Sequence, residues 1–172
     1  MNRKELINKL ISADEEATMI SSSSYTINVV LVGGSVLMIK GLMFRQTPDI
    51  DMVGITRGLD SIFNKYDMNY RANAFSDTLP YNYEDRLEKL ELPTKTIQYY
   101  MLSLEDLIIM KLHSGRDKDW KDITNKEVIK AINWEVLDSI IKNGELDYQS
   151  NERIISDFKY RYQKYLMEYK KI

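Results

Sequence analysis

The run YTINVVLV at residues 25–32 constrains the fold most, because two glycines end it. β-branched and apolar residues favour a buried strand, and Gly33-Gly34 favours a tight turn. The segment 35–42 that follows has the length of a short helix. The sequence therefore predicts a strand that turns directly into a helix.

Helical and strand patterns alternate along the first two thirds of the chain, whereas the last third is helical in pattern throughout. This order predicts an α+β domain with a mixed sheet and a helical C-terminal third. Helices are expected over 3–19, 35–42, 57–66, 103–115, 117–123, 125–132, 134–143 and 151–171, and strands over 25–32, 49–53, 68–75, 87–92 and 96–102.

The length of 172 residues suits one compact unit, with residues 1–123 as the core and residues 124–172 packed on it. The absence of cysteine excludes thiol catalysis and thiolate metal sites. A formal charge of −2 gives no sign of a globally basic nucleic-acid binder. Without an apolar run of membrane-spanning length or a signal-peptide pattern, we expect a cytoplasmic protein without a membrane partner.

A glycine pair between a strand and a helix favours close approach of a phosphate. Backbone N–H groups and the positive end of a helix dipole meet there, and Ser35 adds a hydroxyl. The alternative is an ordinary strand-to-helix turn with a serine cap, which the pattern alone does not exclude. Gly33, Gly34 and Ser35 are therefore candidate phosphate-binding residues.

Two aspartates, Asp49 and Asp51, are separated by one residue on the predicted strand. Side chains two apart share one face of a strand, so Ile50 and Met52 are expected to point into the core. Adjacent carboxylates repel unless a cation lies between them, and such oxygen ligands suit Mg²⁺. The alternative is a solvated strand edge paired with lysine or arginine.

Together, the glycine turn and the aspartate pair resemble the signature of the nucleotidyltransferase superfamily related to DNA polymerase β. The resemblance lies in a hydrophobic strand, Val-Gly-Gly-Ser at 32–35, a gap, and Asp-Ile-Asp-Met at 49–52. It implies a nucleotidyltransferase core on a mixed sheet and a bound nucleoside triphosphate. It also implies that Asp49 and Asp51 are catalytic and hold one or two Mg²⁺ ions.

The segment RQTPDIDM, residues 45–52, is similar to the corresponding part of AbiEii-like toxin nucleotidyltransferases and antibiotic nucleotidyltransferases. That similarity implies that Arg45 and Thr47 also contact the nucleotide.

A second motif occupies residues 102–123. Lys111 lies on the core-facing side of the predicted helix, where a lysine needs an anionic partner. That partner is either a phosphate or the charged turn that follows the helix. The pattern S-x-E-D-L-I-x-x-K-L, then G-R-x-K-D-x-x-D-I, is similar to AbiEii-like proteins and to uncharacterised bacterial nucleotidyltransferase-fold domains. This likeness implies that Lys111 contacts nucleotide phosphates and that Asp119 or Asp122 helps to organise the site.

Members of the superfamily that transfer nucleotides usually carry a third carboxylate on a later strand, where it acts as a base toward the acceptor. The sequence has no sharp match. Glu91, between two leucines on a predicted strand, is the first candidate, followed by Glu84 and Asp77. If none reaches the site, either Asp119 replaces it or catalysis is weaker.

The resemblance implies an enzyme that moves a nucleoside monophosphate from a nucleoside triphosphate to a hydroxyl of tRNA or protein. By analogy, it implies a bacterial toxin-antitoxin or phage-defence component with a cognate antitoxin. Two alternatives stay open. One is a nucleotidyltransferase-fold module that binds the triphosphate with little or no turnover, and the other is an antibiotic nucleotidyltransferase.

The predicted C-terminal helix carries four tyrosines interleaved with lysine and arginine. These tyrosines could stack on RNA bases while the basic side chains neutralise phosphates. The alternative is the packed face of a terminal helix. The residues concerned are Tyr160, Tyr162, Tyr165 and Tyr169.

Overall fold

The computed structural model describes residues 1–21, 26–43, 45–54, 58–146 and 151–170. The chain forms two compact units: unit 1 comprises Met1–Ala74 and Leu87–Leu102, and unit 2 comprises Phe75–Arg86 and Ser103–Ile172. This division does not coincide with the expected boundary after residue 123. Residues 25, 57 and 171, at the ends of three predicted elements, lie outside the described residues.

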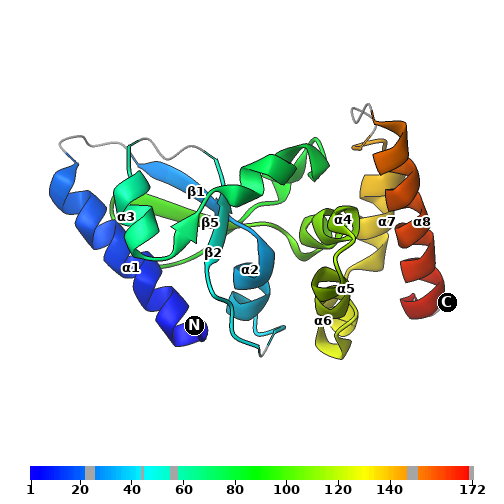
Figure 1. Ribbon diagram of the computed structural model, residues 1–172, viewed down its shortest axis with the longest axis horizontal. Coiled ribbons are helices and arrows are strands. Elements are labelled where there is room, and N and C mark those ends of the chain that lie inside the picture. Colours follow the sequence, from blue (N-terminus) through cyan, green and yellow to red (C-terminus); the bar gives the residue numbers. More distant parts are fainter. Residues whose placement is uncertain (22–25, 44, 55–57, 147–150, 171–172) are drawn as a thin grey trace. The chain divides into compact units, whose positions relative to one another are not determined.

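Unit 1 is built on a mixed sheet, of which Figure 1 labels β1, β2 and β5. Within the described ranges, the strand order is β3-β2-β1-β5-β4. β1 pairs in parallel with β5 and antiparallel with β2, while β2 pairs in parallel with β3. The α+β prediction is therefore confirmed. The strands are β1 (Ile27–Leu31), β2 (Ile50–Val53), β3 (Met68–Asn69), β4 (Glu88–Lys89) and β5 (Ile97–Met101).

The strand predicted over residues 68–75 is much shorter in the structure. β3 ends at Asn69, and the 3-10 helix η1 (Arg71–Thr78) follows it. The side-chain oxygen of Asn69 accepts a hydrogen bond of 3.0 Å from the backbone nitrogen of Arg71. Asparagine competes in this way with strand pairing and turns the backbone, which explains the early end of the strand.

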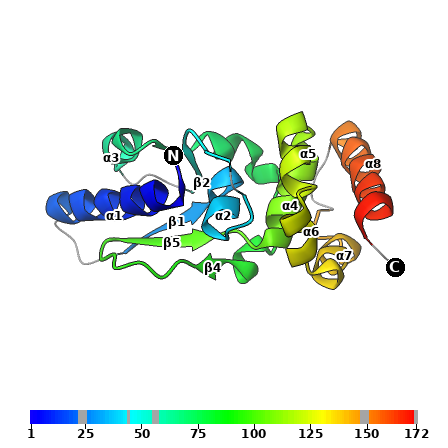
Figure 2. The ribbon, with the colours of Figure 1, turned by 90° about the horizontal axis from the view of Figure 1, so that it is seen from below.

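The helices α1 (Arg3–Ile20), α2 (Gly33–Ile39) and α3 (Asp60–Lys65) accompany the sheet. Figure 2 shows α1 lying along β1 and β5. Leu6 and Leu10 of α1 are completely buried, and the Tyr99 hydroxyl of β5 donates to the Leu10 carbonyl at 2.9 Å. The apolar stripe of α1 therefore covers the sheet, as its spacing predicts.

Asp14, which the sequence patterns do not single out, joins α1 to the start of β5. Its buried carboxylate accepts hydrogen bonds from the backbone N–H groups of Lys95, Thr96 and Ile97, at 2.9, 2.8 and 2.6 Å respectively. Buried backbone N–H groups need hydrogen-bond acceptors, and here the single carboxylate of Asp14 on α1 accepts from three of them.

Replacing Asp14 by alanine is expected to destabilise unit 1 by about 3 kcal/mol or more, because backbone donors of residues 95–97 lose their acceptor inside the protein. Denaturant unfolding measures the loss, and amide exchange should speed up first at residues 95–97. The matched control is Glu15→Ala, because Glu15 is an exposed neighbour on the same helix. The free energy of unfolding of this variant is expected to lie within about 0.5 kcal/mol of the wild-type value. Equal stability of the two variants would contradict this account.

Unit 2 is helical within the described residues. α4 contacts α5, α7 and α8, so residues 103–123 belong with the helical part of the chain. Arg86 joins the segment 75–86 to this unit through bonds to the carboxylates of Asp106 and Glu145, at 2.7 and 2.9 Å. The elements are η2 (Tyr83–Arg86), α4 (Leu104–Ser114), α5 (Asp117–Ile123), α6 (Lys126–Ala131), α7 (Trp134–Lys142) and α8 (Glu152–Tyr169).

Some tyrosine side chains of α8 are packed inside unit 2, and another is exposed to solvent. Tyr162 and Tyr165 are buried, and their hydroxyls donate to Asp138 and to the Ile123 carbonyl, at 2.6 and 2.7 Å. The packing interpretation is confirmed for these two. Tyr160 is 72% exposed. Within the part of the chain that the structure covers, no helix has the length and apolar character needed to cross a bilayer.

Candidate functional site

The turn after β1 places Gly33 against the second aspartate of β2. A methyl group on Gly33 would lie 2.8 Å from Oδ2 of Asp51, and the φ angle of Gly33 is +67°. The positive φ therefore favours glycine at this position, and the turn lies directly against the Asp51 side chain. The backbone nitrogen of Val32 donates to the Asp51 carbonyl at 2.9 Å, which holds the turn beside β2.

Gly34 is bordered by the segment that leads into β2. A methyl group there would lie 3.7 Å from Oγ1 of Thr47 and 3.9 Å from Nη2 of Arg45. Gly34, Arg45 and Thr47, all predicted nucleotide contacts, are thus neighbours in the structure. Thr47 is buried, and its hydroxyl donates to the Asp49 carbonyl at 3.0 Å, so it holds the backbone that carries the aspartates.

Ser35 is only 1% exposed, and its hydroxyl donates to the Val32 carbonyl at 2.6 Å. This bond closes the turn between β1 and α2. The side chain of Val32, at the N-cap of α2, makes no capping hydrogen bond. Ser35 therefore stabilises the glycine turn from inside.

Asp49 and Asp51 are half-buried, while Ile50 and Met52 between and beyond them are completely buried. The predicted division of the strand into a core face and a polar face is confirmed. Asp49 directly precedes β2 and Asp51 lies within it. The two carboxylates therefore project from the same side of this segment.

Asn69, which the sequence patterns do not single out, lies opposite Asp51 on β3. The two residues are partners in the strand register, and the Asn69 amide donates to Oδ2 of Asp49 at 3.1 Å. Asn69 thus contacts the first aspartate of the pair, Asp49, from the neighbouring strand. Only the pairing of β2 with β3 reveals this role, because nothing in the local sequence around residue 69 indicates it.

Glu91, the first candidate for a third carboxylate, follows β4 at the opposite edge of the sheet from β2 and β3. Its side chain is 80% exposed and 3.7 Å from the Lys89 ammonium. β1 and β5 lie between β2 and β4, and strands are spaced by about 4.8 Å. The structure therefore does not bring Glu91 to Asp49 and Asp51.

Lys111 and its two predicted neighbours form a compact cluster within unit 2. The Lys111 ammonium, on a residue that is 6% exposed, donates to Asp119 at 2.6 Å and to Asp122 at 2.9 Å. Burial alone would raise the pKa of Asp119, but Lys111, together with bonds from Ser114 and Arg116, holds it below its ordinary value. These contacts supply the anionic partner that the sequence requires for a core-facing lysine.

His113 is buried in unit 2, stacked on the Phe158 ring at a centroid distance of 4.2 Å. Burial, with a smaller contribution from the charge of Arg161, lowers the pKa of His113 to about 4. The imidazole is therefore neutral at physiological pH.

The carboxylates of Asp49 and Asp51 are chemically compatible with Mg²⁺, which takes oxygen ligands in proteins. Asp51 directs a carboxylate oxygen at a turn without side chains, and Asp49 is oriented by Asn69. Mg²⁺ is usually held by one or two carboxylates plus water and phosphate oxygens. No group of three or more acidic, histidine or cysteine side chains suited to a metal ion occurs in the described part of the chain.

The match to a known protein family covers both sequence motifs. Residues 8–170 match the sequence model of a family described as "Nucleotidyltransferase of unknown function (DUF6036)". The matched range includes the glycine turn, the aspartate pair and the Lys111 cluster. Comparisons with curated proteins and with solved structures gave no match.

Proposed function

We propose a transfer reaction for this chain, which belongs to the family of nucleotidyltransferases of unknown function (DUF6036). In this reaction, the protein transfers a nucleoside monophosphate from a nucleoside triphosphate to an acceptor hydroxyl with the help of Mg²⁺. One observation carries the proposal. The Asp51 carboxylate lies against Gly33, and the Arg45 guanidinium lies near Gly34. A proposed metal ligand and a proposed phosphate-binding cation are thus both close to a turn that carries no side chain.

In this proposal, the glycine turn seats the β- and γ-phosphates and Arg45 neutralises part of their charge. Thr47 and Ser35 hold the backbone that forms the seat, and Asn69 orients Asp49. Asp49 and Asp51 hold Mg²⁺, which supplies charge stabilisation at the reacting phosphate when it is bound.

The reaction forms one bond and breaks one. The acceptor oxygen attacks the α-phosphorus, the bond from that phosphorus to the bridging oxygen breaks, and pyrophosphate leaves with the bond electrons. The acceptor proton passes to a carboxylate base, and Asp49, whose carboxylate accepts a hydrogen bond from Asn69, is the proposed one. Hydroxyls of tRNA or protein are the proposed acceptors, in a toxin-antitoxin or phage-defence setting.

A triphosphate-binding module with little turnover is the second candidate. Asn69 favours it, because an amide stands opposite Asp51 where a third carboxylate would complete a metal site. An amide neither carries negative charge nor accepts the acceptor proton readily. The two candidates differ in turnover and agree in Mg²⁺-dependent binding.

The test is label transfer with purified protein, Mg²⁺ and each α-labelled nucleoside triphosphate, offered total tRNA or a protein extract. We expect label on a macromolecule and release of pyrophosphate. Mg²⁺-dependent triphosphate binding without transfer would favour the binding module. Absence of binding as well would refute the nucleotide site in unit 1.

Replacing Asn69 by aspartate is expected to raise Mg²⁺ affinity about tenfold, because a third carboxylate would face Asp51 across the strand pair. Without Mg²⁺ the variant should be less stable than wild type, since three like charges repel. Calorimetric Mg²⁺ titration measures the first effect and thermal unfolding the second. Asn64→Asp, an exposed change of equal charge on α3, is the control, and equal affinities for both variants would contradict a site beside Asn69.

A further inference from the structure

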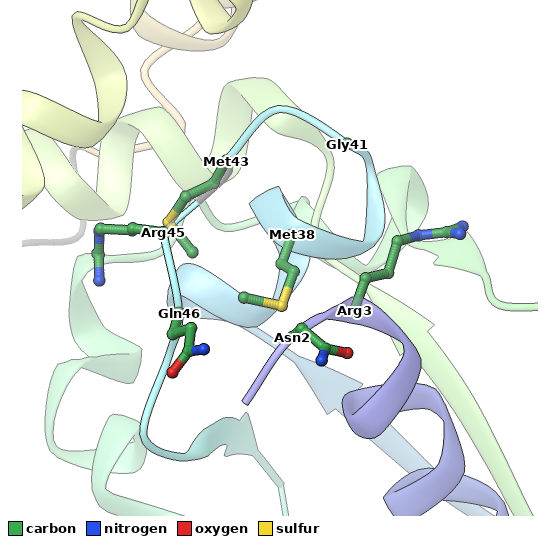
Figure 3. Close-up of a pocket in the computed structure, with 7 residues that line it drawn as sticks. All are labelled: Asn2, Arg3, Met38, Gly41, Met43, Arg45 and Gln46. Carbon is green, nitrogen blue, oxygen red and sulfur yellow. The ribbon is translucent and has the colours of Figure 1, made fainter.

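A cavity of about 210 Å³ lies in unit 1 between the start of α1 and the segment that follows α2. Figure 3 shows the side chains of Met38 and Met43 directed into the same space, with Gln46 and Asn2 below them. Both methionines are buried, whereas Gln46 and Asn2 are exposed at the opening. The cavity therefore has apolar thioether walls and an amide-bearing rim.

The walls of this cavity are tied to each other by hydrogen bonds. Nε of Arg3 donates to the Ile39 carbonyl at 3.0 Å, which joins the start of α1 to the end of α2. The backbones of Met1 and Thr47 exchange two hydrogen bonds, of 2.6 and 3.3 Å. The cavity is thus formed by contacts within unit 1 before any ligand enters, which lowers the cost of binding.

The cavity adjoins the glycine turn through two of its own lining residues. A methyl group on Gly34 would lie 3.2 Å from Cε of Met43 and 3.9 Å from Nη2 of Arg45. In Figure 3 the guanidinium of Arg45 extends out of the cavity. Arg45 therefore reaches from the cavity to the candidate phosphate seat, and one ligand can occupy both.

The size and chemistry of the cavity select a class of ligand. Pockets for drug-sized molecules measure roughly 300–1,000 Å³, so this cavity suits one ring system of a larger ligand. Methionine sulfur packs favourably against aromatic rings and adapts to their outline. Side-chain amides both donate and accept, as the edge of a heterocyclic base requires.

We propose that this cavity is the nucleobase subsite of the triphosphate site, with the base between Met38 and Met43 and its edge at Gln46. The proposal rests on the proposed function, because the triphosphate on the glycine turn brings the base to the cavity. The Gln46 amide can donate and accept hydrogen bonds, whereas Asn2 offers only its NH2 group, because its side-chain oxygen accepts from the Glu5 N–H as the cap of α1. The subsite therefore accepts more than one base, and Gln46 tunes the preference.

The experiment observes methionine methyl groups directly by NMR. Protein labelled with ¹³C at the methionine methyls is titrated with ATP, GTP, CTP and UTP, and in parallel with tripolyphosphate, all with Mg²⁺. Met38→Leu and Met43→Leu, which conserve volume, assign the two signals. We expect ring-current shifts at Met38 and Met43 with a nucleotide and none with tripolyphosphate. The exposed methyls of Met19 and Met167 should stay unchanged.

A blocking variant provides the second measurement. Gln46→Trp should fill the cavity mouth and lower nucleotide affinity about tenfold, to that of tripolyphosphate, whose own affinity should not change. Met19→Trp is the matched control, an exposed residue at the other end of α1, roughly 25 Å away. Its nucleotide affinity should equal that of wild type.

The outcomes separate the two proposals. If nucleotide and tripolyphosphate bind equally well and neither moves the Met38 and Met43 signals, the cavity holds no base, while the phosphate site stands. If neither compound binds, the proposed function fails and the subsite with it. If Gln46→Trp leaves nucleotide affinity unchanged although nucleotide binds more tightly than tripolyphosphate, the base lies elsewhere and this inference is overturned.

Discussion

Asp51→Asn is expected to slow nucleotidyl transfer about a hundredfold or more, which corresponds to roughly 3 kcal/mol of transition-state stabilisation. The amide keeps the shape of the side chain but removes the charge that a Mg²⁺ ligand needs. The strand that carries residue 51 is anchored by the completely buried Ile50 and Met52. Stability should therefore stay within about 1 kcal/mol of wild type.

The matched control for this prediction is Asp67→Asn. Asp67 belongs to the same unit, its side chain is 52% exposed, and its φ of +57° suits asparagine. This variant should lose its ion pair with Lys9 and retain transfer activity. Rates are measured with α-labelled nucleotide over a range of Mg²⁺ concentrations. Similar rates for Asp51→Asn and Asp67→Asn would rule out Asp51 as a metal ligand in catalysis.

Lys111→Met is expected to destabilise unit 2 by about 3–5 kcal/mol, because it leaves the carboxylates of Asp119 and Asp122 buried without their shared cation. Methionine fills the volume of the lysine stem, so the loss reports the charge and not a cavity. Urea denaturation measures it. Adding Asp119→Asn and Asp122→Asn should recover part of the stability, because the buried charges are then removed as a set.

Lys118→Met is the control, an exposed lysine on the neighbouring helix α5. It should change stability by less than about 0.5 kcal/mol. If Lys111→Met is as stable as this control but binds triphosphate weakly, Lys111 acts on the nucleotide phosphates and not as a buried counter-charge. The measurement therefore decides between the two partners that the sequence allows for this lysine.

The same cluster has a defined pH dependence. Because the pKa of Asp119 is held below its ordinary value in the folded protein, its contribution to stability is present above the unfolded pKa, about 3.9. That contribution is lost as the pH falls through the folded value. Acid unfolding of Lys111→Met should consequently show a smaller loss of stability in this range than wild type.

Local pattern was sufficient for much of the fold and for part of the site. The β-branched run before Gly33 predicts β1, and the alternation around Asp51 predicts which residues of β2 enter the core. Ser103 as the cap of α4 and Gly115 as its end are equally local, since Oγ of Ser103 accepts from the Asp106 nitrogen and Gly115 has a φ of +62°. Such features depend on neighbours in the chain, so the sequence contains them.

Contacts between distant segments were decided by tertiary structure alone. Asn69 meets Asp49 only because β3 pairs with β2, and Glu91 is separated from the aspartates only because β4 lies at the other edge of the sheet. Asp14 finds its three donors about eighty positions away. Composition and spacing report what each segment prefers by itself, whereas strand order and register determine which side chains meet. The sequence by itself therefore determined the glycine turn, the aspartate pair and the elements that carry them, and only the tertiary structure decided their partners.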